Sequence, residues 1–279
     1  MSKDARVRLR PTHWLAGLAT LASCAGISCS RPARTDYATV VRIIATDSGF
    51  VMPAKIGSGI REVRLLNHGS VMHEGVFEHF FSPDGRAAAF VESVRAGIDV
   101  PSIAEDAGGP GLAAPGESTV VWMDLFPGHY AVGCWYGNHL SHVGMQDFDV
   151  VAATSSAKPP AVDLQVRCLD FTYEFSGSWN AGAHRVLVEN AGTEEHEFDP
   201  YRLGPGRKPA DFFRWIETGR HGPAPAIALG GSGTFPPGRR IWLPLTLTPG
   251  RYFAFCQMPA KVGGKAHYQM GMVREFEVK

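Results

Sequence analysis

The sequence lacks an excess of charge of either sign, because its 279 residues contain 27 basic and 27 acidic side chains. No basic surface is therefore expected, and nucleic acid is excluded as a partner. Charged residues make up only 19% and apolar residues 44% of the chain, which excludes an intrinsically disordered protein. Five cysteines are too few for a disulfide framework, so each cysteine has to be explained by its position.

Long hydrophobic runs are also missing. The apolar stretch 14–22 is shorter than the roughly 20 residues that span a bilayer, and it follows a basic segment, residues 1–10. This order is typical of a secretory signal peptide, here residues 1–23. It ends in Leu21-Ala22-Ser23-Cys24, which resembles the lipobox of bacterial lipoproteins. We therefore expect an exported lipoprotein on the periplasmic side of a bacterial cell envelope, lipidated on Cys24 and tethered to the membrane through residues 24–36.

The sequence repeats itself at a nearly constant offset. His196-Glu197 follows His73-Glu74 by 123 residues, and Cys256 follows Cys134 by 122. Other landmarks keep the same spacing: Asp47 with Asp170, and Pro127-Gly128 with Pro249-Gly250. A linker rich in small residues and proline, residues 152–160, separates the copies. We predict two copies of one domain, residues 37–151 and 161–279.

Short β-branched or alternating segments bounded by glycine and proline dominate both copies. The predicted strands are residues 40–44, 62–66, 118–123 and 130–134 in the first copy and 164–168, 185–189, 240–247 and 252–256 in the second. One helix is expected in each copy, at residues 87–96 and 210–218. The chain is therefore predicted to be all-β, with two tandem Greek-key β-sandwich domains, each with a short helical insertion.

Each copy carries the same ordered set of metal-ligand types: an early His, a Cys near the end of a strand, and then a His and a Met before the last strand. The candidates are His73, Cys134, His139 or His142, and Met145 in the first copy, and His196, Cys256, His267, and Met270 or Met272 in the second. Two imidazoles and one thiolate with a distant thioether match the ligand preference of blue copper.

At these residues the sequence resembles the cupredoxins, the family of type 1 copper proteins. The resemblance implies a copper ion in each copy, held by the upstream His, the Cys, a downstream His and an axial Met. It assigns these roles to His73, Cys134 and Met145, and to His196, Cys256, His267 and Met272. For the downstream His of the first copy, the spacing to Met145 favours His139 over His142. The implied function is electron transfer or copper handling with a redox partner protein that the sequence does not identify.

The sequence departs from the family pattern in two places. Glu74 and Glu197 follow the upstream His, where many cupredoxins have an Asn that ties the ligand loops together. We expect these carboxylates to supply an outer hydrogen bond or a hard ligand. His267 also follows Cys256 by 11 residues, against 5 in the first copy, so the second copper is expected to be weaker or more exposed. The remaining Cys168 is interpreted as a buried small hydrophobe, and Thr193-Glu194-Glu195 as a solvated loop.

Two other functions compete with that of a copper carrier. Two-domain nitrite reductases and small laccases bind their catalytic copper through His-x-His pairs and a His beside the Cys. The sequence has no His-x-His and no His next to Cys134 or Cys256, so we expect no enzyme activity. The other alternative is a metal-free cupredoxin-like module that binds a protein or ligand at the cell envelope.

Overall fold

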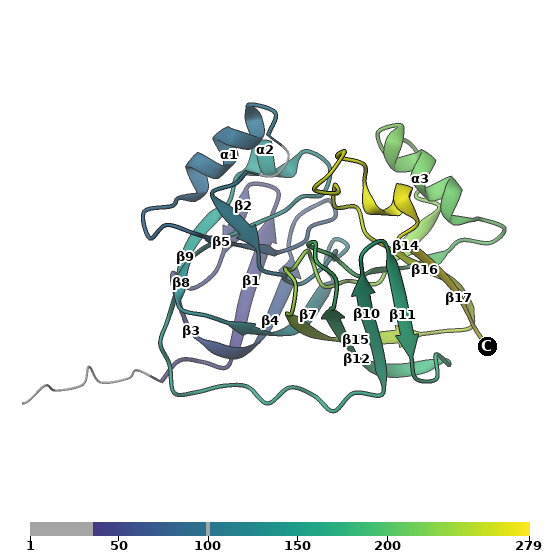
Figure 1. Cartoon of the computed structure of the whole chain (residues 1–279), viewed down its shortest axis with the longest axis horizontal. Coiled ribbons are helices and arrows are strands. Elements are labelled where there is room, and N and C mark those ends of the chain that lie inside the picture. Colours follow the sequence, from purple (N-terminus) through teal and green to yellow (C-terminus); the bar gives the residue numbers. More distant parts are fainter. Residues whose placement is uncertain (1–35, 99–100) are drawn as a thin grey trace, which may run out of the picture. The chain divides into compact units, whose positions relative to one another are not determined.

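The computed structural model describes residues 36–98 and 101–279. The predicted signal peptide, Cys24 and most of the tether lie outside the described residues. Within the described part of the chain, no helix is long and apolar enough to cross a bilayer. Strands dominate both copies and helices are few (Figure 1). The prediction of an all-β fold is confirmed.

The first copy contains nine strands and two short helices: β1 (Val40–Thr46), β2 (Gly49–Val51), β3 (Lys55–Gly57), β4 (Gly59–Asn67), β5 (Val76–Phe80), α1 (Ala87–Arg95), β6 (Ala104–Asp106), β7 (Ser118–Leu125), β8 (Gly128–Gly133), α2 (His139–Val143) and β9 (Gln146–Val151). The second copy contains β10 (Leu164–Leu169), β11 (Thr172–Ser176), β12 (Gly182–Asn190), β13 (Asp199–Leu203), α3 (Pro209–Glu217), β14 (Ala226–Ala228), β15 (Arg240–Leu247), β16 (Gly250–Phe255), the 3-10 turn η1 (His267–Met270) and β17 (Val273–Val278). Helices α1 and α3 match the two predicted helices to within one residue at each end.

Alternating burial along the strands explains the sandwich. In β1, Val41, Ile43 and Ala45 are buried while the residues between them are more exposed. Side chains of a strand point to opposite faces in turn, so such a strand buries one face only. The buried faces of β1, β4 and β7 share one core with residues of β8 and β9 from another sheet. The chain passes from sheet to sheet between β4 and β5, β6 and β7, and β7 and β8, as in Greek-key sandwiches.

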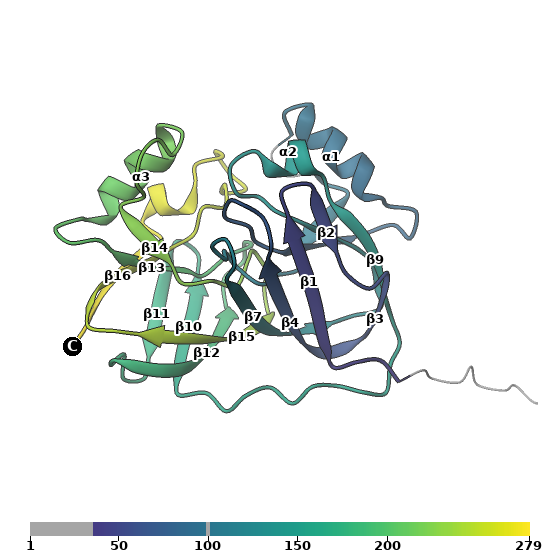
Figure 2. The same ribbon diagram turned by 180° about the vertical axis from the view of Figure 1, so that it is seen from behind.

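The two copies share one sheet. Eight strands run in the order β11-β10-β12-β15-β7-β4-β1-β2, and each copy adds a second sheet of its own, β3-β9-β8-β5-β6 or β14-β13-β16-β17 (Figure 2). The junction is the antiparallel pair β7 and β15, where Met123 is opposite Ile241 and Trp122 is opposite Trp242. Pairing the two edges removes two exposed strand edges.

Glycine-rich loops at equivalent places in the repeat form a second contact between the copies. The amides of Gly108, Gly109 and Gly111 donate to the carbonyls of Thr234, Ser232 and Gly231 over 2.7, 2.8 and 3.2 Å. A Cβ on Gly111 would lie only 2.5 Å from the amide nitrogen of Gly231, which is a steric clash. The close approach of the two loops therefore requires glycine.

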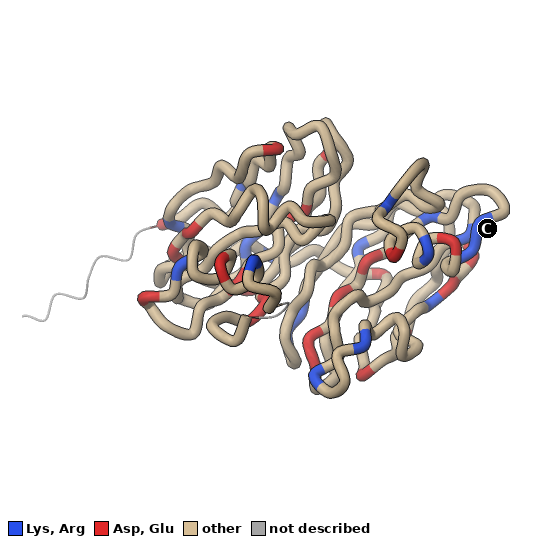
Figure 3. Tube along the Cα trace, turned by 90° about the horizontal axis from the view of Figure 1, so that it is seen from above, with Lys and Arg blue, Asp and Glu red and all other residues tan. Residues whose placement is uncertain are grey.

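The segment between β9 and β10 carries no strand and is tied to the first copy. Ala157 donates its amide to Ile60 over 2.7 Å, and Ser155 donates its hydroxyl to the Tyr37 carbonyl over 2.6 Å. Basic and acidic positions are interspersed along both copies (Figure 3). The exact domain boundaries remain a prediction.

Candidate metal centres

The upstream His of each copy lies on a loop that a buried Asn organises. Asn67 ends β4, is fully buried, and donates through Nδ2 to the carbonyls of Val71 and Ala113. Its Oδ1 accepts the amide of Gly69 over 2.8 Å. Asn190 makes the three equivalent contacts at the end of β12. The buried Asn at the end of each strand therefore fixes the loop that carries His73 or His196.

The Cys and the downstream His come from the other sheet and the connection that follows it. Cys134 directly follows β8, and His139 begins the short helix α2. In the second copy Cys256 directly follows β16, and His267 begins η1. The longer second connection is held by amide hydrogen bonds from His267 to Met258 and from Tyr268 to Cys256, of 2.8 and 2.9 Å.

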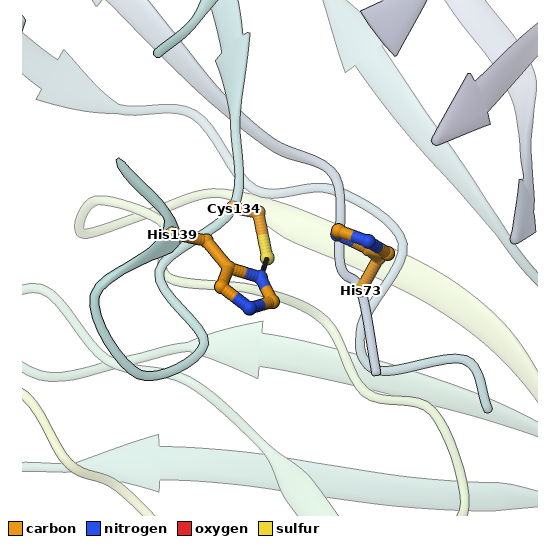
Figure 4. Close-up of side chains that lie close together, drawn as sticks. All are labelled: His73, Cys134 and His139. Atoms are coloured by element: carbon orange, nitrogen blue, oxygen red, sulfur yellow. Dashed lines mark hydrogen bonds between the residues drawn. The ribbon is translucent and has the colours of Figure 1, made fainter. Parts of the chain in front are cut away.

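In the first copy the structure brings together His73, Cys134 and His139 (Figure 4). One ligand atom from each lies within 4.8 Å of the others. The Cys134 Sγ is 3.4 Å from His139 Nδ1, and the two imidazole rings are 4.9 Å apart. His73 and Cys134 are buried, whereas His139 is half-buried.

The second copy repeats this arrangement with His196, Cys256 and His267, all fully buried. The Cys256 Sγ is 3.3 Å from His267 Nδ1, and the rings are again 4.9 Å apart. His196 Nδ1 and His267 Nδ1 face each other at 3.1 Å. Two nitrogens and one sulfur thus converge in each copy.

Carboxylates hold the outer nitrogens of these imidazoles. The Nε2 atoms of His73 and His196 lie 3.2 and 3.0 Å from Asp47 and Asp170, and His267 Nε2 lies 3.1 Å from Glu194. A carboxylate that accepts Nε2–H leaves the lone pair on Nδ1, the inward nitrogen. Within the described residues His73 Nδ1 is buried with no hydrogen-bond partner, and with Nε2 protonated the facing Nδ1 atoms of His196 and His267 carry lone pairs. Both arrangements fit a cation between the ligands.

The protonation of the ligands also suits a metal. Burial lowers the pKa values of His139, His196 and His267, so these imidazoles are neutral at pH 7. Burial, with the charge of Glu74 as a second cause, raises the pKa of the Cys134 thiol to about 12. Burial likewise raises the pKa of Cys256 well above its usual range. Binding of a metal to either thiol therefore has to release its proton.

Glu74 and Glu197 tie the two ligand loops together. Glu74 Oε1 accepts the amide of Trp135, the residue after Cys134, over 2.9 Å, and Glu197 Oε1 accepts the amide of Gln257, the residue after Cys256. Neither glutamate belongs to the groups of converging donors. Of the two roles expected from the sequence, the structure shows the outer hydrogen bond.

The axial candidates separate by burial. Met272 is fully buried, and its backbone accepts the amide of Cys256 and donates to the carbonyl of His267. Met270 is 41% exposed. Met145 is half-buried, with its side chain against Gly133, the neighbour of Cys134. His142 is exposed and directs Nδ1 to the Asn138 carbonyl. The positions therefore favour Met272, and they favour His139 over His142.

Two loops, one after an Asn and one after a Cys, thus place two imidazoles and a thiol at one end of a β-sandwich, twice in one chain. Each copy has a cupredoxin-like fold. No family model and no curated protein sequence match the chain. The assignment of the fold rests on these strands and this donor geometry.

Among solved structures, a dithionite-reduced auracyanin from Roseiflexus castenholzii is 20% identical and covers 41% of this chain and 94% of its own, with a TM-score of 0.30. A multicopper oxidase is 16% identical and covers 86% of this chain and 88% of its own, with a TM-score of 0.26. A copper nitrite reductase from Nitrosomonas europaea is 14% identical and covers 86% of this chain and 93% of its own, with a TM-score of 0.25.

Two sequence expectations about the cupredoxin-like sites were wrong. The Thr193-Glu194-Glu195 segment is not a wholly solvated loop: Thr193 is exposed, but Glu194 is mostly buried and accepts from His267 and from the Lys261 amide. The second site is also not the more exposed one, since His267 is fully buried whereas His139 is only half-buried. Weaker binding of the second copper stays a prediction. The long connection folds over its own His. The sequence identified Asp47 and Asp170 as repeat landmarks. It did not predict that they hold the histidine Nε2 atoms, because each lies 26 positions before its histidine.

Loss of the outer carboxylate is expected to weaken copper binding at that site only. Asp170→Asn removes the charge that holds His196 Nε2–H, and such changes cost about 10- to 100-fold in metal affinity. Competition with a copper chelator measures the loss. Asp163→Asn is the matched control, since Asp163 holds His184 away from both sites. An Asp170→Asn protein with the copper affinity of the control would contradict this role.

Proposed function

We propose that the protein is an exported copper protein that carries single electrons or handles copper at the cell envelope, with a type 1-like ion in each cupredoxin-like copy. The observation that carries this proposal is the convergence of two imidazole nitrogens and one cysteine sulfur, twice, with the outer nitrogens held by carboxylates. When bound, copper in such a ligand set supplies a one-electron couple between Cu(I) and Cu(II).

The residues around each site limit movement when an electron is exchanged. The upstream His is fixed by Asp47 or Asp170, and the Cys is fixed through Glu74 or Glu197 and the amide that follows it. Such ties preorganise the ligands. Of the imidazole and thiol ligands, His139 alone is half-buried. Electrons therefore reach the first site most directly through His139.

We expect no turnover of nitrite or phenols by the copper-loaded protein. Within the described residues, the groups of three converging His, Cys, Asp or Glu donors are the two cupredoxin-like sites. Both contain a cysteine, so neither is the open, histidine-rich site that a substrate requires. Reductive titration should deliver one electron per copper and be reversible. Turnover above a free-copper control would overturn the proposal of an electron carrier and would establish an oxidase or nitrite reductase.

We also propose that lipidation of Cys24 anchors the protein to the membrane. Its support is the order of basic segment, apolar stretch and lipobox-like Leu21-Ala22-Ser23-Cys24. Fractionation of cells that express Cys24→Ala tests the anchor, with Cys29→Ala as the control. We expect only Cys24→Ala to move to the soluble periplasmic fraction. Membrane retention of Cys24→Ala equal to that of the parent would refute the anchor.

A further inference from the structure

A cavity of about 730 Å³ is lined by residues of both copies. This volume falls in the range of small-molecule sites, about 300 to 1,000 Å³. None of the six converging His and Cys residues lines it. Glu74, Trp135, Glu197 and Gln257 do, and they are the residues that follow the ligands. The cavity is therefore separate from the metal centres but adjoins both of them.

Buried carboxylates gather on the wall of the cavity. Glu78 and Asp106 are opposite each other across β5 and β6 and are only 2% and 7% exposed. Asp199 of the second copy is 9% exposed, and its Oδ1 has no hydrogen-bond partner within the described residues. Burial raises the pKa of Glu78 to about 7 and the pKa of Asp199 well above its usual range. Glu78 accepts the indole N–H of Trp135 over 3.1 Å, whereas the unpartnered oxygen of Asp199 is costly to bury, and a bound cation would offset that cost.

One basic side chain of the described chain, Arg220, lines this cavity. Its guanidinium lies over the ring of Tyr136, 4.9 Å from the ring centre. This contact shows that the wall already accommodates a cation on an aromatic face. A single arginine leaves most of the acidic groups without a counter-charge.

The other walls are aromatic. Trp135, Tyr201, Phe212 and Trp215 line the cavity together with the carboxylates. Carboxylates alone would suit a hard metal ion, but such an ion needs oxygens that converge on one point. Within the described residues, only the two cupredoxin-like sites bring three donors within 4.8 Å of one another. The separated carboxylates and the aromatic rings instead suit a larger cation with an apolar body.

We propose that this cavity binds a small organic cation, an amine or quaternary ammonium whose charged end lies on the acidic wall that carries Asp199, Glu78 and Asp106 and whose apolar body lies against the aromatic side chains. This site goes beyond copper binding and does not depend on it. It also places the ligand next to the loops that follow Cys134 and Cys256.

Calorimetric titration of the mature protein with three probes of the same body tests the site: phenethylammonium, 2-phenylethanol and phenylacetate. The expected result is saturable binding of one phenethylammonium, at least about tenfold tighter than the alcohol, and no binding of phenylacetate. If the alcohol binds as tightly as the amine, the site is not a cation site. Binding of Ca²⁺ or Mn²⁺ without binding of the amine would replace the proposal by a metal site.

Asp199→Asn and Asp106→Asn are expected to weaken phenethylammonium at least about tenfold. Glu277→Gln is the control, because Glu277 is exposed on β17 and does not line the cavity. An amide has nearly the shape of a carboxylate, so both variants should fold, and their copper uptake should equal that of the parent. Unchanged amine affinity in both variants would overturn the proposal, whatever the copper content.

Discussion

Cys134→Ser and Cys256→Ser are each expected to remove one copper site, and the double variant is expected to lose both copper ions and all strong visible absorption. A serine hydroxyl is neither a soft donor nor the source of a thiolate-to-Cu(II) charge-transfer band. The two sulfurs lie in separate groups of donors, so each substitution should leave the other site intact. Copper analysis and absorption spectra of the two single variants and the double variant measure the effect.

Cys168→Ser is the matched control for the two cysteine variants. Cys168 is fully buried in the core on β10 and belongs to neither group of donors. The control should therefore keep both copper ions and the full spectrum. Full copper content and spectrum in the Cys134→Ser/Cys256→Ser variant would show that the ligands are wrongly assigned.

Gly109→Ala is expected to lower the free energy of unfolding by more than about 3 kcal/mol. Gly109 has a φ of 159°, and a Cβ there would fall on the carbonyl oxygen of Gly75. The same loop donates to the second copy and accepts the amide of Gly75 through Pro110, so it has no free direction in which to move. Denaturant unfolding of the copper-free protein measures the loss.

Gly49→Ala is the control that separates the effect of the steric clash on stability from the effect of the unusual backbone conformation. Gly49 has a similar φ of 146°, but no heavy atom lies within 4 Å of the position of its Cβ. Its substitution should cost about 1 kcal/mol, the usual order for a left-handed glycine. Equal losses in the two variants would mean that the Gly109 loop moves away from Gly75 without cost, and would contradict the rigidity of this loop.

The sequence was sufficient to predict the strands, which show as an alternation of residue types, and the site residues that the repeat pairs with each other. Alternation of apolar and other residues predicted strands such as residues 240–247, which match β15. The constant offset placed His73 with His196 and Cys134 with Cys256, and the structure brings each pair into equivalent groups. These features depend on local spacing or on comparison of the two copies.

The features that the sequence did not predict depend on contacts between distant residues. Glu194 reaches His267, 73 positions away, only because the long connection folds over the site. The shared sheet depends on β7 meeting β15 at edges whose residues look like those of any strand. The acidic cavity needs Asp106 and Asp199 from different copies, and nothing in the repeat pairs them.

Titration of the mature apoprotein with Cu(II) tests the central claim most directly. The account predicts that each chain binds two copper ions, and that a strong thiolate-to-copper absorption band grows until the second equivalent is bound. Proton release should accompany this binding, because both buried thiols are protonated beforehand. A protein that takes up no copper, or that takes it up without a charge-transfer band, would contradict the account and favour a metal-free binding module.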